Sequence, residues 1–198
     1  QEIICYDGKT FIMEEMEGLN FKINAKSFFQ TNTEQAYELY KITRDFAGLK
    51  GKELVYDLYT GTGTIAQFIA KDCNRVVGVE SVPEAIEAAN TNAKENGIKN
   101  AFFEVGDMRR VFNQDFINRH GKANVVIADP PRNGMHPAVV KQLLFLQPEK
   151  IVYVSCNPST QARDLFLMKD HYKLVRSKAI DLFPQTQHVE NVVLLEKI

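Results

Sequence analysis

Two segments carry side chains that can do chemistry, and each one ends an apolar, β-branched run. Residues 129–134 read Asp-Pro-Pro-Arg-Asn-Gly after the run 125–128, and residues 155–160 read Ser-Cys-Asn-Pro-Ser-Thr after the run 151–154. Such runs are typical of buried parallel strands, so both segments should emerge at the carboxyl edge of one sheet. Open α/β sheets bind ligands at that edge. The carboxylate and the thiol delivered there indicate a nucleophilic cysteine beside a bound cofactor.

Cys156 is the candidate nucleophile. Cysteine is commonly a small buried hydrophobe, and Cys5 and Cys73 fit that interpretation. Cys156 differs because it leaves a strand at the active edge and directly precedes an expected helix start at 157–160. The exposed N–H groups and the dipole of a helix N-terminus favour thiolate over thiol. We therefore expect Cys156 to act as a nucleophile.

Glu190 is the candidate general base. It enters a strongly apolar strand, and burial of an unpaired charge is costly. Partial burial would raise its proton affinity into a range that suits a general base. The alternative is a glutamate at the rim that accepts a backbone hydrogen bond. For the nearby His188, a structural hydrogen bond explains the residue as well as proton transfer does.

Asp129 and its two prolines have two interpretations. The prolines can simply end a strand and fix a turn. They can also hold the Asp129 carboxylate at a fixed angle toward a flat substrate. In methyltransferases that act on amines an aromatic residue usually follows such a pair, whereas Arg132 follows here. This difference disfavours methylation of an exocyclic amine.

A glycine-rich segment, residues 57–63, ends the first core strand and opens a helix. Gly61 and Gly63 allow a tight turn and a close approach of a ligand to backbone N–H groups. Together with Ala66 they also satisfy a loose dinucleotide fingerprint, and Glu80 lies at a tolerable distance for it. A tight turn without a ligand is a third interpretation.

Asp57 favours a different cofactor. A carboxylate four residues before Gly61 suits the ammonium group of an amino-acid-bearing cofactor such as S-adenosylmethionine, and suits a pyrophosphate badly. Glu80 ends the second strand, where an acid can accept hydrogen bonds from both hydroxyls of a ribose. Asp107 ends the third strand, where it can meet an adenine edge or a polar neighbour.

Strand-like and helix-like patterns alternate from residue 53 onward. Strands are expected over 53–59, 75–80, 101–106, 124–128, 151–154, 172–181 and 189–196, and helices over 64–71, 83–96, 109–120, 137–145 and 159–169. This alternation implies βαβ units and an α/β fold with a doubly wound, mostly parallel sheet. The last two strands fit an antiparallel hairpin that ends the sheet, which then has seven strands.

Local signals set the helix starts and the N-terminal arm. Ser81 and Glu84 have capping-box spacing, and Thr31 and Glu34 are spaced to cap a helix that runs through about Phe46. That helix should bury Ala36, Leu39, Tyr40, Thr43 and Phe46 along one side. Before it, strand-like stretches at 2–6, 10–15 and 20–23 predict a small antiparallel β arm.

Composition excludes several classes of protein. At 198 residues, with 44% hydrophobic and 25% charged residues, the chain is one globular domain. A net charge of −1 gives no whole-domain electrostatic case for nucleic acid, so RNA contacts would need local patches or a part of the protein outside this chain. Apolar runs are too short to span a membrane, and no signal peptide is visible. Three scattered cysteines without metal-ligand spacing predict no metal site and a cytoplasmic setting.

The chain resembles the bacterial-type RNA (uracil-5-)-methyltransferases, the family that makes 5-methyluridine in tRNA and ribosomal RNA. The segments that carry the resemblance are 28–32 (Phe-Phe-Gln-Thr-Asn), 57–63, 129–134, 153–160 and 181–190 (Asp-x-Phe-Pro-Gln-Thr-x-His-Val-Glu). The resemblance covers essentially the whole chain after residue 20. It implies a class I, Rossmann-like methyltransferase fold with S-adenosylmethionine as cofactor. We expect a β arm and linker over 1–32 and the catalytic domain over 33–198.

The same resemblance assigns the site residues. Cys156 would add to carbon 6 of a uracil, which makes carbon 5 nucleophilic, and Glu190 would remove the carbon 5 proton after methyl transfer. The cofactor would be surrounded by Gln30, Tyr59, Gly61, Gly63, Thr64, Glu80, Asp107 and Asp129. Family members often carry asparagine at the position of Thr64, which weakens its assignment.

The resemblance also predicts the partner, an RNA whose target uridine is flipped out of the stack. Phe28, Phe29 and Phe183 are candidates to stack on that base, although core packing is the favoured explanation for each of them. Full-length members typically carry an N-terminal β-barrel RNA-binding domain, sometimes with an iron–sulfur cluster, and we expect that this domain is missing here. We also expect a monomer. The alternatives are a methyltransferase acting on an amine or on cytosine carbon 5, and an RNA-binding remnant without turnover.

Overall fold

The computed structural model describes residue 4, residues 6–24 and residues 30–198. Cys5, Phe28, Phe29 and the greater part of the strand predicted at 2–6 lie outside these residues. The described elements are β1 (Phe11–Met16), β2 (Leu19–Asn24), α1 (Thr33–Ala47), β3 (Leu54–Leu58), α2 (Thr64–Ile69), η1 (Ala70–Asp72), β4 (Arg75–Glu80), α3 (Pro83–Glu95), β5 (Ala101–Val105), α4 (Gln114–His120), β6 (Val125–Ala128), α5 (Pro137–Leu146), β7 (Lys150–Ser155), α6 (Pro158–Met168), β8 (Tyr172–Ile180) and β9 (Glu190–Lys197).

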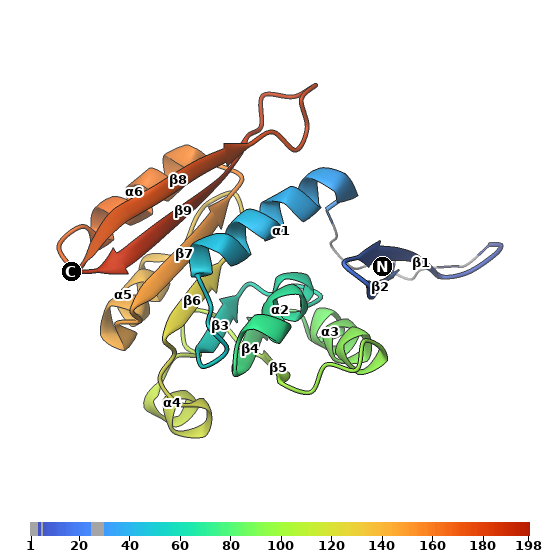
Figure 1. Cartoon of the computed structure of the whole chain (residues 1–198), viewed down its shortest axis with the longest axis horizontal. Coiled ribbons are helices and arrows are strands. Elements are labelled where there is room, and N and C mark those ends of the chain that lie inside the picture. Colours follow the sequence, from blue (N-terminus) through green and yellow to red (C-terminus); the bar gives the residue numbers. More distant parts are fainter. Residues whose placement is uncertain (1–3, 5, 25–29) are drawn as a thin grey trace.

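A seven-stranded sheet in the order β5-β4-β3-β6-β7-β9-β8 forms the centre of the molecule (Figure 1). The five strands from β5 to β7 are parallel, whereas β9 runs antiparallel to both β7 and β8. The predicted α/β fold with a C-terminal antiparallel hairpin is therefore confirmed. The strand order reverses between β3 and β6, which is the point where doubly wound sheets bind ligands.

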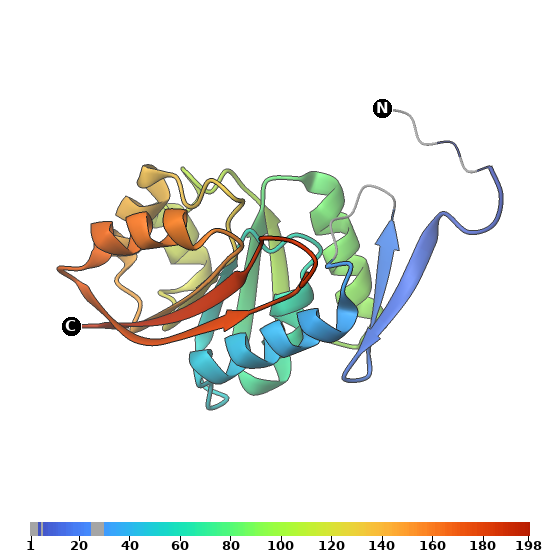
Figure 2. The same ribbon diagram turned by 90° about the horizontal axis from the view of Figure 1, so that it is seen from above.

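Helices cover both faces of this sheet. Figure 2 shows α1 on one face, with α5 and α6 on the other. Strands β3, β6 and β7 are buried on both sides because their side chains meet a separate apolar cluster on each face. All five α1 residues predicted to face the core, from Ala36 to Phe46, are buried as expected. Within the described residues, none of the helices combines the length and apolar character needed to cross a bilayer.

The two predicted capping residues are wrong. Asn32, not Thr31, caps α1 by accepting from the Gln35 N–H at 3.2 Å. For α3 the N-cap position is Val82, because the Ser81 hydroxyl and N–H both donate to the neighbouring Glu80 carboxylate instead. The helix expected over 109–120 is also shorter, since α4 begins only after Asn113 caps it.

The β1–β2 hairpin confirms the small antiparallel arm and lies beside α3 (Figure 2). Asn92 of α3 and Asn96, its C-cap residue, hold the hairpin. Asn92 exchanges two hydrogen bonds with the backbone of Lys22, and Asn96 exchanges two with the backbone of Asn20. Between these contacts Phe21 is fully buried. The hairpin is therefore anchored to α3 through hydrogen bonds between asparagine side chains and the hairpin backbone, as well as through apolar packing.

Candidate active site

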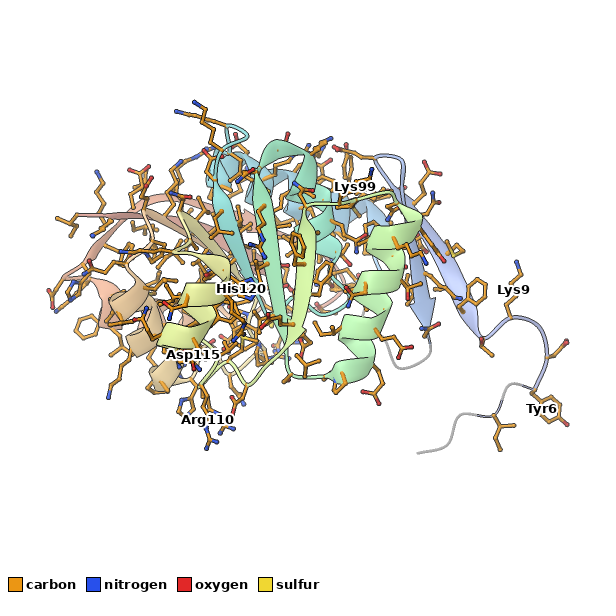
Figure 3. The ribbon with its side chains drawn as sticks, turned by 90° about the horizontal axis from the view of Figure 1, so that it is seen from below. Tyr6, Lys9, Lys99, Arg110, Asp115 and His120 are labelled. Carbon is orange, nitrogen blue, oxygen red and sulfur yellow. The ribbon has the colours of Figure 1, made fainter. Side chains whose placement is uncertain are left out.

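The carboxyl edge of the sheet collects the loops that follow β3, β4, β6 and β7. Figure 3 shows the two edges: Lys99, which precedes β5, lies at the opposite end of the sheet from Arg110, which follows it. A pocket at the amino edge, lined by Glu17, Lys71 and Lys99 among others, brings together no residue predicted to be functional. The carboxyl edge is thus where the candidate site lies.

The β3–α2 loop has an unusual backbone. Tyr59 adopts φ 62°, a conformation uncommon for residues other than glycine, and it is followed by Gly61 at 56° and Gly63 at 76°. A Cβ on Gly63 would come within 2.6 Å of the Phe103 ring, whereas a Cβ on Gly61 would meet no atom within 4 Å. Gly63 is therefore required for packing, and Gly61 leaves the backbone open to a ligand.

A pocket opens over this loop. Its lining includes five predicted cofactor residues, namely Gln30, Tyr59, Gly61, Thr64 and Asp129, together with Tyr40, Thr60, Thr62 and Ile65. Tyr40 was predicted as a core residue of α1, and its helical spacing gives no sign that one end of the side chain reaches a pocket. Thr60 and Thr62 were not predicted as site residues, because only the glycines of this segment match a known ligand-binding pattern.

Glu80 adjoins the same loop. Its Oε1 accepts hydrogen bonds from the Ser81 N–H, the Ser81 hydroxyl and the Val82 N–H, and its Oε2 accepts from the Gly61 N–H at 3.4 Å. Three short contacts on one oxygen fix the carboxylate at the end of β4. The second oxygen has only one long contact, which leaves acceptor capacity on the side of the loop.

Asp57 lies beneath the loop with one oxygen unpaired. The side chain is almost fully buried, its Oδ2 accepts from the Thr60 hydroxyl, and its Oδ1 has no hydrogen-bond partner among the described residues. Burial raises the pKa of Asp57 to about 7, interactions with the Thr60 hydroxyl and the Ala66 backbone N–H oppose that rise, and the Glu80 carboxylate adds to it. A buried acceptor without a donor is rare, and it matches a cofactor that brings an ammonium group.

Asp107 does not join the pocket. Arg109 holds both of its oxygens, with Nε at 2.9 and 3.1 Å and Nη2 at 2.7 Å. These hydrogen bonds from Arg109 lower the pKa of Asp107 to about 2. A ligand that reaches Asp107 would have to share the carboxylate with this arginine.

Cys156 and Glu190 occupy corresponding ends of two paired strands. The antiparallel ladder of β7 and β9 closes with Ser155 opposite Asn191, so the next residue on each side is Cys156 and Glu190. After burial, the Glu190 carboxylate is the next largest cause of the raised pKa of Cys156, so the two side chains lie near one another. Cys156 is partly exposed and Glu190 is at the limit of burial. The sulfur is therefore accessible beside a buried carboxylate.

The charges around Cys156 oppose a thiolate in the free protein. Burial raises the pKa of the Cys156 thiol, the carboxylates of Glu190 and Asp129 raise it further, and Arg132 lowers it. The helix N-terminus was expected to favour the thiolate, but Asn157 already caps α6 through the Ser159 N–H. The end of the helix is thereby partly satisfied, and burial together with the two acids leaves the pKa of Cys156 above its ordinary value.

The acids also act on one another. Burial, then the carboxylates of Glu190 and Asp57, raise the pKa of Asp129 to about 8, and burial raises the pKa of Glu190. Asp129 lines the pocket over the β3–α2 loop and also affects Cys156. It therefore connects the predicted cofactor site with the predicted nucleophile.

Three remaining residues have structural contacts. An arginine can only donate, so the 2.7 Å contact from Arg132 Nη2 makes His188 Nδ1 an acceptor, in line with the hydrogen-bond interpretation of His188. Phe183 packs against the core, as one of its two interpretations states. Cys73 is buried, as predicted.

The fold and the carboxyl-edge pocket define a class I methyltransferase, a class that takes its methyl group from S-adenosylmethionine. M. jannaschii TYW2 in complex with AdoMet shares the fold at 22% identity and a TM-score of 0.67, covering 99% of this chain and 90% of that one. The family model for tRNA (uracil-5-)-methyltransferases matches residues 9–198. The chain belongs to that family.

Two further relatives show how much of a longer protein the chain spans. An uncharacterized RNA methyltransferase of Porphyromonas gingivalis is 61% identical over 98% of this chain and 42% of its own length. Pyrococcus abyssi tRNA (uracil-54, C5)-methyltransferase, in complex with S-adenosyl-L-homocysteine, is 39% identical with a TM-score of 0.83. The match covers 95% of this chain and 45% of that structure. The chain thus spans less than half the length of these two relatives.

Proposed function

We propose that this domain transfers a methyl group from S-adenosylmethionine to carbon 5 of a uridine in RNA, through a temporary bond between Cys156 and carbon 6. The observation that carries this proposal is the placement of Cys156 opposite Glu190, with Asp129 connecting both to the cofactor pocket. The full protein's substrate is proposed to be a tRNA or ribosomal RNA whose target base is flipped out of its stack.

The cofactor fits the residues at the pocket. Gln30, Tyr59, Gly61, Thr64 and Asp129 line it, and Glu80 presents a carboxylate oxygen beside Gly61. The unpaired Oδ1 of Asp57 lies below. When bound, S-adenosylmethionine supplies an electrophilic methyl group. Asp107 is proposed as a weaker contributor because Arg109 holds it, and Gly63 contributes through the shape of the loop.

The reacting groups follow from the chemistry of uracil. Carbon 5 is too weak a nucleophile alone. The Cys156 thiol first gives its proton to solvent, and addition of the resulting thiolate to carbon 6 moves the electron pair of the 5,6 double bond toward carbon 5. After carbon 5 has taken the methyl group and S-adenosylhomocysteine has departed with the electron pair of the broken S–C bond, the Glu190 carboxylate removes the remaining proton from carbon 5. The electron pair of the broken C–H bond then restores the 5,6 double bond as the C–S bond breaks, which releases Cys156 as thiolate.

The position of Arg132 supports uracil over an exocyclic amine. Its guanidinium lies within electrostatic reach of the sulfur and contacts His188, so the segment after the two prolines presents a cation where an aromatic ring would be needed to stack on an amine-bearing base. Methylation of cytosine at carbon 5 would use the same cysteine chemistry. Analysis of the methylated nucleosides distinguishes it from methylation of uracil.

Product analysis tests this proposal. The protein is incubated with tRNA and ribosomal RNA lacking methylation and with methyl-labelled S-adenosylmethionine, and the RNA is digested to nucleosides. The proposal predicts label in 5-methyluridine. Label in 5-methylcytidine or in an N-methylated nucleoside would replace the substrate assignment, and RNA binding without label transfer would identify a remnant without turnover.

A further inference from the structure

The loop between β6 and α5, which carries Arg132, is held from outside by the helix that follows the nucleophile. The Asn157 side-chain amide and the Thr160 hydroxyl both donate to the carbonyl of Arg132, at 3.2 and 3.1 Å. These two residues are the N-cap and a first-turn residue of α6, directly after Cys156. The backbone at Arg132 is thus tied to the chain segment that presents the sulfur.

One turn later, α6 holds the next part of the same loop. Arg163 donates to the carbonyl of Asn133 at 2.9 Å, and Asp164 Oδ2 accepts from the N–H of Met135 at 2.7 Å. We refer to Asn157, Thr160, Arg163 and Asp164 as the loop clamp. Its four side chains engage the backbone at residues 132, 133 and 135.

Asp164 is the centre of the clamp. It is fully buried, and its Oδ2 also accepts from the Tyr153 hydroxyl at 2.8 Å. Its Oδ1 accepts from Arg163 Nε at 3.0 Å and Nη2 at 2.8 Å. A buried carboxylate is stable only when such donors satisfy it. Asp164 therefore fixes α6 to β7 and, at the same time, orients the arginine that holds Asn133.

Gly134 shows independently how close the loop comes to the clamp. It adopts φ 76°, and a Cβ there would lie 2.6 Å from Asp164 Oδ2 and 2.8 Å from Arg163 Nη2. The backbone therefore passes against the clamp at a distance that only glycine allows. This contact and the hydrogen bonds together define a single position for the loop.

We infer that Asp164 is a positioning residue for the reaction at Cys156, because it ties the loop that carries Arg132 to the helix that follows the sulfur-bearing residue. The inference rests on the proposed function and names a residue outside the pocket, since Asp164 does not line it. The clamp ends on residues 132–135, whereas the cofactor loop is held by its own contacts with Glu80 and Val79. Loss of the clamp should therefore impair the RNA step and spare cofactor binding.

The test compares Asp164→Ala and Asp164→Asn with Asp170→Ala, which changes an exposed aspartate just beyond α6. The first measurement is hydrogen exchange of the peptide spanning 130–136. Asp164→Ala should exchange there at least about tenfold faster, because the Met135 N–H loses its acceptor. Asp170→Ala should match the unsubstituted protein. Unchanged exchange in Asp164→Ala overturns the inference whatever the activity shows.

The second measurement is the rate of covalent adduct formation with tRNA and ribosomal RNA transcripts made with 5-fluorouridine. The RNA is saturating, and the rate is divided by the concentration of folded protein. Asp164→Ala should form the adduct about 10- to 100-fold more slowly, as expected for a reacting group displaced by about 1 Å. Affinity for S-adenosylhomocysteine should stay within about twofold, a split that general destabilisation does not produce. Asp164→Asn keeps an acceptor for Met135 and should recover the larger part of the rate.

Two outcomes separate the inference from the proposed function. An Asp164→Ala adduct rate equal to that of the unsubstituted protein, or an equal loss in RNA reaction and cofactor affinity, contradicts the positioning role while the proposed function stands. Absence of any adduct with the unsubstituted protein contradicts the proposed function, and the exchange measurement alone then decides whether Asp164 holds the loop.

Discussion

Cys156 and Glu190 are the first residues beyond the last paired rung of β7 and β9, where Ser155 faces Asn191. Thirty-four positions separate them in the sequence, and the antiparallel hairpin alone brings them together. Because β9 runs against β7, the residue that follows one strand meets the first residue of the other. An acid and a sulfur are thereby delivered to the same corner of the carboxyl edge.

Replacement of the sulfur tests its role directly. Cys156→Ala should lower methyl transfer at least about 1000-fold, because no other described cysteine lies at this edge and a lost covalent nucleophile costs orders of magnitude. Affinity for S-adenosylhomocysteine should be unchanged within about twofold by calorimetry. Cys73→Ala is the matched control, which should lose stability at a buried site yet keep turnover per folded molecule. Turnover that survives in Cys156→Ala would exclude the nucleophile.

Loss of the base should trap an intermediate. Glu190→Gln keeps the shape of the side chain but cannot accept the carbon 5 proton, so a methylated protein–RNA adduct should accumulate. Denaturing gels and intact-mass spectrometry measure the adduct. Glu196→Gln, at the other end of β9, should release product at the normal rate. Normal product release by Glu190→Gln would assign the proton transfer to another group.

The groups around the Cys156 sulfur predict how the rate of its alkylation depends on pH. Burial and the carboxylates of Glu190 and Asp129 raise the pKa of Cys156, and Arg132 lowers it. Below that raised pKa the thiol is protonated and alkylates slowly. At pH 8, Glu190→Gln should accelerate alkylation by iodoacetamide, and Arg132→Met should slow it, each on the order of severalfold. Peptide mass spectrometry resolves each cysteine, and changes of the opposite sign would refute this electrostatic account.

The raised pKa of Asp129 predicts that this residue lowers the free energy of unfolding at high pH. Its pKa is about 8 in the folded protein against an ordinary value of 3.8. A carboxyl with a raised folded pKa is most stabilising while protonated, so its contribution is lost as pH rises from about 4 to 8. Asp129→Asn should therefore raise the free energy of unfolding by about 2–4 kcal/mol at pH 8 and by much less at pH 4. Urea unfolding at both pH values measures this, with Asp170→Asn as an exposed control; equal effects at the two pH values would contradict it.

Substitutions of the two glycines of the β3–α2 loop should have different effects, one on stability and the other on cofactor binding. Gly63→Ala forces a Cβ against Phe103 and Ala89 at positive φ and should cost about 2–4 kcal/mol of stability. Gly61→Ala meets open space and should cost only about 1 kcal/mol. Its added methyl group should instead weaken S-adenosylhomocysteine binding where the backbone faces the pocket. The reverse pattern, measured by urea unfolding and calorimetry, would refute this assignment.

The sequence was most informative where burial leaves a simple pattern. Strands such as β6 and β7 are covered on both faces, so their residues are uniformly apolar and β-branched, and their carboxyl ends could be located from the chain alone. The face of α1 followed from helical spacing for the same reason. Asp129 and Cys156 could be placed at one edge because parallel strands all end there.

Side chains that choose between several partners could not be predicted. Ser81 donates to Glu80 and not to the helix, and Asn32 takes the cap of α1 while its amide donates to Leu182. The raised pKa of Cys156 comes from burial and from the carboxylate of Glu190, neither of which can be read from the local sequence of the helix N-terminus. In the sequence, Asp164 resembles any polar residue of a surface helix. Its role depends on contacts with Tyr153, Met135 and Arg163, which only the structure shows.

Mapping of the covalent adduct tests the central claim most directly. The protein is incubated with S-adenosylmethionine and 5-fluorouridine transcripts of tRNA and ribosomal RNA, and the RNA-linked peptide is sequenced by mass spectrometry. The account predicts one linked peptide, attached through Cys156 to a pyrimidine that carries a new methyl group. Linkage through any other residue, or formation of 5-methyluridine in uridine RNA without an adduct in the fluorinated RNA, would contradict it.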